Sequence, residues 1–214
     1  MEAISNYEKL CLEWRQRFQH MDQGRLCRLL PGLSAEEDFL TLEHFARVYA
    51  IDRRTGEITA PHDPDPVTQE EQLNIYTLFG YCRDDARLTG RWVPFRELEG
   101  ASPFAPAFEL HVLRPMAAAF SGRIHALKTA AAALGGIPLP HSDAGFQLYA
   151  FPGIPMQFLF WDSDEEFPAQ ANILYDAGVT RFIHVESTVS LAGEGLCRLL
   201  RAAGLPVPRS AFGM

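Results

Sequence analysis

The most constraining feature of the sequence is a pair of apolar runs separated by only four residues. Residues 146–151 and 156–161 are rich in aromatic and aliphatic side chains, and the segment 152–155 (PGIP) joins them. Runs of this length and composition are typical of β-strands. A connection this short suits a hairpin, because a parallel crossover takes about a dozen residues or more. The chain therefore reverses here, and the start of the first strand meets the end of the second at one sheet edge.

The other periodic segments fall into blocks of strands and blocks of helices. A third strand over 169–175 extends the hairpin into a meander, and residues 39–59 contain a smaller antiparallel meander. Thr68 and Glu71 form a capping box that starts a helix through Tyr81. Further helical patterns cover residues 4–21, 106–113, 123–134 and 187–204, the last with Ser187 or Thr188 as its cap. Because strands and helices do not alternate, we predict an α+β fold, with helices packed on a mixed, mainly antiparallel sheet that includes a C-terminal three-stranded meander.

Length and composition indicate one domain with its own core. Of the 214 residues, 47% are hydrophobic and 21% are charged, which is typical of a globular chain. We expect a single α+β domain over residues 5–204 and a loosely held tail over 205–214. The N-terminal segment has no basic stretch followed by an apolar one, and no segment is long and apolar enough to cross a bilayer. We therefore expect a cytoplasmic protein.

Charge and motif content argue against several classes of function. The net charge of −8 argues against nucleic acid or an anionic membrane as partner, because clustered Lys and Arg bind both. The four cysteines have no CxxC spacing, so this chain encodes no iron–sulfur cluster. It also has no glycine-rich phosphate loop, no GxSxG nucleophile elbow and no HExxH zinc motif.

The densest polar feature is the acidic loop, residues 162–168 (DSDEEFP), directly after the second strand of the hairpin. The hairpin places His141 and Asp143 at the same sheet edge, so one rim collects an imidazole and up to five carboxylates. Oxygen ligands with a histidine suit a divalent metal ion such as Mg²⁺, Mn²⁺, Ca²⁺ or Fe²⁺. The candidate metal ligands are Asp143, Asp164, Glu165 and His141, and the catalytic candidates are Asp164, Glu165, Glu166 and Asp143.

The same acids also suit a solvated turn, because Asp and Glu after a strand act as turn formers and helix caps. We predict that Asp143 and residues 162–166 share one sheet edge, with carboxylate oxygens of the two segments within about 8 Å, a span that one cation or water can bridge. If the side chains converge, at least one of Asp164, Glu165 and Glu166 is buried and hydrogen-bonded, because a bare buried carboxylate is costly.

A second candidate site lies in residues 90–98 (GRWVPFREL). Trp92 and Phe95 stand three residues apart beside Arg96, and such a group could line a ligand pocket. The alternative is that the rings plug the end of a sheet. The apolar stripe along residues 4–21 has two interpretations of the same kind, a helix packed on its own core or a helix that binds a partner.

Several of these segments together resemble the prokaryotic domain-of-unknown-function family 3786. The segments that carry the resemblance are GRWVPFREL at 90–98, LGG at 134–136, HSD at 141–143, WDSDEEFPAQANILYDAG at 161–178, and Glu186. The W-x-x-D-E-E-F-P and I-L-Y-D stretches are the specific part, and the resemblance runs from about Tyr7 to Leu200.

The resemblance implies a biological context and no reaction. It implies that the family's members are proteins of anaerobic bacteria and archaea. Some of them are fused to a four-iron–four-sulfur module similar to that of corrinoid iron–sulfur proteins. This chain lacks the cysteine-rich module, and the resemblance carries over no catalytic residue.

Three functions stay open, and the sequence does not decide whether the protein is an enzyme. The first is a soluble domain in anaerobic cofactor or redox metabolism that binds a small molecule or a protein partner, such as an iron–sulfur or corrinoid protein, with Trp92, Phe95 and Arg96 at the ligand. The second is a metal-assisted hydrolase or lyase at the acidic rim, with Glu166 as general base. The third is a structural or interaction protein that docks through the 4–21 stripe or the acidic face.

Overall fold

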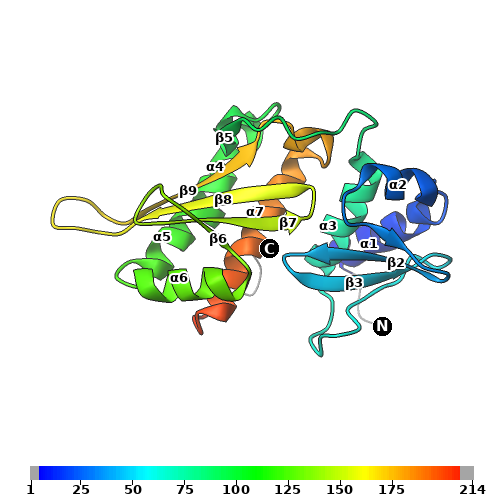
Figure 1. The fold of residues 1–214 in the computed structure, drawn as a ribbon, viewed down its shortest axis with the longest axis horizontal. Helices are drawn as coiled ribbons and strands as arrows, with labels where there is room; N and C mark the ends of the chain where they lie inside the picture. Colours follow the sequence, from blue (N-terminus) through cyan, green and yellow to red (C-terminus); the bar gives the residue numbers. More distant parts are fainter. Residues whose placement is uncertain (1–4, 208–214) are drawn as a thin grey trace.

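Figure 1 shows the computed structural model of the chain, which describes residues 5–207. Its larger sheet has five antiparallel strands in the order β5-β9-β8-β7-β6. β7 (Ala144–Phe151) and β8 (Ile154–Trp161) form the predicted hairpin, and β9 (Gln170–Asp176) completes the predicted meander. The edge strands are β5 (Trp92–Pro94) and β6 (Ile137–Leu139).

The smaller sheet contains four antiparallel strands in chain order. They are β1 (Ser34–Ala35), β2 (Phe39–His44), β3 (Arg47–Asp52) and β4 (Ile58–Thr59). Three helices accompany this sheet: α1 (Asn6–Phe18), α2 (Gln23–Leu29) and α3 (Gln69–Tyr81). Two mainly antiparallel sheets with their helices confirm the predicted α+β class.

The remaining helices pack against the larger sheet and against one another. After β5 come η1 (Phe95–Glu97), η2 (Ser102–Phe104), α4 (Ala105–Phe108), η3 (Glu109–Leu113), α5 (Arg114–Phe120) and α6 (Ile124–Ala133). After β9 come η4 (Val179–Arg181) and α7 (Val185–Ala202). The helical segment around Pro115 is irregular. η3 is a π-helical turn just before this proline, which has no N–H to donate to the preceding turn.

α7 begins earlier than its sequence pattern indicates. Ser187 or Thr188 was the expected cap, and this prediction is wrong because His184 is the N-cap residue. The Nδ1 atom of His184 accepts a hydrogen bond from Glu186 N–H at 3.3 Å, so an imidazole nitrogen takes the place of a serine or threonine oxygen.

The two sheets meet at the tip of the β2–β3 hairpin. Phe45 and Ala46 form the turn with φ values of 47° and 61°, a left-handed conformation that costs an L-residue about 1–2 kcal/mol. Phe45 N–H donates to Ala150 O on β7 at 3.1 Å, and the Phe45 ring is buried against α7. A Cβ on Gly195 of α7 would lie 3.1 Å from this ring and 2.8 Å from that of Phe158. Interactions with the larger sheet therefore hold the strained turn in place.

One continuous hydrophobic core contains buried side chains from both sheets and from α7, and Leu205 and Val207 pack against it in part. Residues 208–214 of the expected tail lie outside the described residues. The span of the single domain, 5–204, stays a prediction. Across residues 5–207, every helix is too short or too polar to cross a membrane.

Candidate functional site

The acidic loop lies at the sheet edge that the hairpin predicts. Ala144 at the start of β7 pairs with Phe160 near the end of β8, and Asp162 N–H donates to Asp143 Oδ2 at 2.9 Å. These contacts confirm that Asp143 and the loop share one edge. In Figure 1 the loop extends beyond the body of the sheet, between β8 and β9.

Within the acidic loop the carboxylates accept hydrogen bonds from neighbouring backbone. Asp164 Oδ1 accepts from Glu166 N–H at 2.8 Å and from Phe167 N–H at 2.7 Å, and these bonds lower the pKa of Asp164. Asp162 Oδ1 accepts from Gly122 N–H at 2.8 Å and so ties the loop to the turn before α6. Backbone N–H groups thus satisfy Asp162 and Asp164.

The rim does not gather its acids around one point. Asp164, Glu165 and Glu166 are all exposed, as are His141 and Asp143. In the part of the chain that the structure describes, no three His, Cys, Asp or Glu side chains form a group that could hold a metal ion. The burial expected for converging carboxylates is not found, and the loop has the geometry of a solvated acidic turn.

The aromatic segment around Phe95 lies mostly in the core. Phe95 is 2% exposed and stacks on Phe108 with ring centroids 4.3 Å apart, whereas Arg96 is exposed and Trp92 half-buried. A hollow of about 270 Å³ lies beside Phe95 and Arg96, with Asn172 in its wall, but Trp92 does not line it. The structure therefore brings two of the three sequence-predicted ligand residues to one small hollow.

Two segments that carry the family resemblance hold each other in place. β5 from the 90–98 segment pairs with β9 from the 161–178 segment. The buried carboxylate of Asp176 accepts from Gly90 N–H at 2.7 Å and from Thr89 N–H at 2.9 Å. Burial alone would raise the pKa of Asp176, but these backbone hydrogen bonds outweigh it and lower the pKa. Asp176 therefore has a structural role.

A buried ionic network joins the two halves of the fold. Glu71 on α3 is 2% exposed and accepts from Arg47 at 2.9 Å, from Tyr49 at 2.6 Å and from Arg198 of α7 at 2.8 Å. Arg198 also contacts Glu194 at 2.7 Å. Burial would raise the pKa of Glu71, but the hydrogen bonds and the two guanidinium charges lower it. Every charge at the centre of this network has a partner.

His44 lies beside the network and stays neutral. Its Nδ1 atom is 2.7 Å from Ala150 O, and because a carbonyl only accepts, Nδ1 carries the proton. Nε2 is buried without a partner among the described residues. Complete burial, together with the charge of Arg198, lowers the pKa of His44 to about 3.

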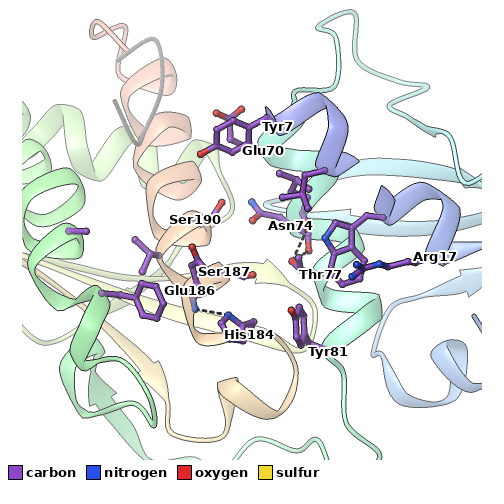
Figure 2. A pocket seen from close by; sticks show the side chains of 16 residues that line it. Tyr7, Arg17, Glu70, Asn74, Thr77, Tyr81, His184, Glu186, Ser187 and Ser190 are labelled. Atoms are coloured by element: carbon purple, nitrogen blue, oxygen red, sulfur yellow. Dashed lines mark hydrogen bonds between the residues drawn. The ribbon is translucent and has the colours of Figure 1, made fainter. Parts of the chain in front are cut away.

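A pocket lies between α1 and α3 on one side and α4 and α7 on the other. Its volume is about 420 Å³, and 16 residues line it. Figure 2 shows Tyr7 and Glu70 near one end of the pocket and His184 and Tyr81 near the other. Between these ends, Asn74 faces the first turns of α7, where Ser190 lies.

Asn74 is the most unusual group in this pocket. Its side chain is 1% exposed, yet its amide nitrogen has no hydrogen-bond partner in residues 5–207. It belongs to a stripe along α3 that lines the pocket at helical spacing, Glu70, Asn74, Thr77 and Tyr81. Figure 2 shows the amide directed toward α7, so the unpaired donor faces the pocket.

Aromatic rings line the opposite end of the pocket. The Trp14 ring lies 5.7 Å from that of Tyr81, and the Tyr81 ring lies 5.1 Å from that of His184. Trp14 packs onto the backbone of α3, where a Cβ on Gly80 would lie 2.3 Å from its ring. Because Nδ1 of His184 accepts from Glu186 N–H, the proton of the neutral imidazole is on Nε2.

Sequence reasoning missed the pocket because its walls come from segments far apart in the chain. The 4–21 stripe supplies both core and pocket. Cys11, Trp14 and Phe18 are buried, and Trp14 also lines the pocket together with Tyr7. Ile4 lies outside the described residues. Asn74 gives no local signal, since a polar residue within an amphipathic helix is normally on the exposed side.

A family model described as "Domain of unknown function (DUF3786)" matches residues 28–198, which confirms the resemblance. The match contains the acidic loop and the α3, α4 and α7 walls of the pocket, whereas the α1 wall precedes it. No curated protein and no solved structure matches the chain.

Proposed function

This chain belongs to the family described as "Domain of unknown function (DUF3786)", and we propose that it binds a small molecule in the pocket between α1, α3, α4 and α7. The observation that carries this proposal is the buried, unpaired amide of Asn74. A buried donor without an acceptor costs about 1–3 kcal/mol. A ligand that brings a carbonyl, hydroxyl or ring nitrogen to Asn74 would remove this cost.

The size and lining of the pocket support a compact organic ligand. Ligand sites are usually about 300–1,000 Å³, largely apolar, with a few convergent polar groups. The pocket, at about 420 Å³, combines aromatic rings with the amide of Asn74 and the hydroxyl groups of Ser187 and Ser190. Its volume favours a small ring system over a corrinoid macrocycle.

Binding has more support than catalysis. His184 uses Nδ1 to cap α7, and within the described chain neither Ser187 nor Ser190 is hydrogen-bonded to its ring. A nucleophilic serine needs such a base beside it. The metal-assisted hydrolase or lyase has less support still, because the acids of the rim are exposed and are not grouped.

The wider context remains part of the proposal. A protein partner, such as an iron–sulfur or corrinoid protein of anaerobic metabolism, is implied by the resemblance alone. The cysteines are all free, and burial raises the pKa of Cys11 and of Cys197 to about 11. Unreactive thiols of this kind suit the cytoplasmic location that we propose.

A thermal-shift screen of a chemically diverse small-molecule library tests the binding proposal. At least one compound should stabilise the wild-type protein, because a ligand selective for the folded state raises its stability. The Asn74→Leu variant, of similar side-chain size, should lose this response.

Asn172→Leu is the matched control, because Asn172 lines the smaller hollow beside Phe95 and Arg96. It should respond to the same compounds as the wild type. If Asn172→Leu abolishes the response and Asn74→Leu preserves it, the ligand binds at the smaller hollow and our assignment of the pocket is wrong.

A further inference from the structure

The distribution of chemical groups along the pocket constrains what its ligand looks like. The aromatic end is a continuous wall, because the Trp14, Tyr81 and His184 rings follow one another at centroid distances of 5.7 and 5.1 Å. Tyr81 is 44% exposed, so part of its ring is free to contact a ligand. Flat π-systems stack on such rings whatever their substituents. This end therefore suits a planar ring.

The middle of the pocket suits a ring edge that carries both a donor and an acceptor. An asparagine amide presents one donor and one acceptor side by side, which matches the amino group and adjacent ring nitrogen of an adenine-type base. Asn74 has an unpaired donor here, one turn along α3 from Thr77 and two turns from Tyr81. A base near the aromatic wall would thus point its polar edge along α3 toward Asn74.

The charges of the pocket disfavour a phosphate. Two carboxylates, Glu70 and Glu186, line it, and its one guanidinium, from Arg17, stacks on Trp14 with Cζ 4.9 Å from the ring centroid. The first turn of α7 would attract an anion, but Glu186 already provides negative charge there. Carboxylates and serine hydroxyls instead suit the hydroxyl groups of a sugar, which can donate to both.

We infer that the ligand is an unphosphorylated nucleoside of the adenosine type. Its base lies between the aromatic wall and Asn74, and its hydroxyl groups face the serines of α7. This inference rests on the proposed function and narrows it to one ligand class.

Calorimetric titration of the full chain with adenosine, adenosine 5′-monophosphate and ribose tests the inference. Adenosine should bind, ribose should not, and the monophosphate should bind at least about tenfold more weakly because its charge faces two carboxylates. Tyr81→Leu should weaken adenosine binding about tenfold, the size expected for the loss of one stacking ring. Glu70→Gln should reduce the difference in affinity between adenosine and its monophosphate.

Tyr149→Leu is the control for the stacking variant, because Tyr149 lies on β7, outside the pocket, and is exposed to a similar extent, 42%. It should bind adenosine as the wild type does. A monophosphate that binds as tightly as adenosine, or ribose that binds as well, would overturn the inference.

The experiment also separates this inference from the proposed function. If adenosine does not bind but another library compound responds to Asn74→Leu, the nucleoside inference is wrong and the pocket assignment stands. If no compound of any class stabilises the protein, both are wrong.

Discussion

The acidic loop and the α3–α7 interface hold their polar groups in opposite ways. In the loop, four carboxylates stand close together in sequence, and the structure leaves Asp164, Glu165 and Glu166 in solvent, with two backbone N–H groups donating to Asp164. At the interface, Glu71 and Asn74 stand one turn apart on α3 and are both buried, one with several partners and one with an unpaired amide. Charge density in a sequence therefore marks a turn at least as readily as a site. A buried polar group without a partner is the more informative signal.

The largest expected change in the free energy of unfolding comes from Glu71, the interface residue with several hydrogen-bond partners. Glu71→Ala leaves Arg47 and Arg198 buried without their shared carboxylate and removes the capping box of α3. Breaking a buried ion pair by deleting one partner costs about 3–5 kcal/mol of unfolding free energy. Chemical denaturation measures it, with Glu165→Ala in the acidic loop as the matched control that leaves the midpoint unchanged. Equal losses in both variants would remove the distinction between the two regions.

The next largest expected effect is a pH dependence of stability that originates at His44, beside the Glu71 network. The folded-state pKa of His44 is about 3, below its ordinary value of 6.5, so between these values the unfolded chain binds a proton that the folded protein excludes. The contribution of His44 to stability is therefore complete above pH 6.5 and falls by about 1.4 kcal/mol per pH unit below it. The carboxyl groups of Glu71 and Asp176 have lowered pKa values, so they add losses only at more acidic pH.

Denaturation between pH 5 and 7 measures this slope. His44→Phe keeps a ring stacked on Phe151. It should lower the slope of unfolding free energy against pH by about 1.4 kcal/mol per pH unit, which corresponds to one proton. His141→Gln, an exposed histidine beside the acidic loop, should keep it. A slope that disappears with His141→Gln and persists with His44→Phe would contradict the assignment.

A smaller change in the free energy of unfolding, of opposite sign, is expected at Asn74, the interface residue with an unpaired amide nitrogen. Asn74→Leu removes a buried donor without a partner and should raise the free energy of unfolding by about 1 kcal/mol. Sites that bind ligands are commonly less stable than they could be for this reason. Thermal or chemical denaturation in the absence of ligand measures the gain. A loss of stability would show that the amide has a partner, such as ordered water, and is not free for a ligand.

The smallest effect is expected at the acidic loop. Because its carboxylates are exposed and are not grouped, addition of MgCl₂ or MnCl₂ should raise the unfolding temperature no more than NaCl of equal ionic strength. Asp143→Asn and Glu165→Gln should not alter this response. Saturable stabilisation by one of these metals that disappears in either variant would restore the rim as a metal centre.

Features set by residues close together in the chain were predictable from the sequence. The four-residue connection forces the β7–β8 hairpin, and the resulting edge correctly placed Asp143 beside the acidic loop. The capping box of Thr68 and Glu71 is present as its spacing indicates. The cap of α7 was mispredicted because an imidazole can accept the hydrogen bond that a hydroxyl oxygen usually takes.

The class of fold, the reversal at residues 152–155 and the start of α3 follow from the sequence alone, because each depends on backbone geometry over a few residues. Which polar groups are paired depends on tertiary packing. Glu71 receives its cations from Arg47 and from Arg198, 24 and 127 residues away, whereas Asn74, one turn further along α3, faces the pocket. Burial depends on long-range packing between helices and sheets, and the free energy of a polar group depends on burial and partners together.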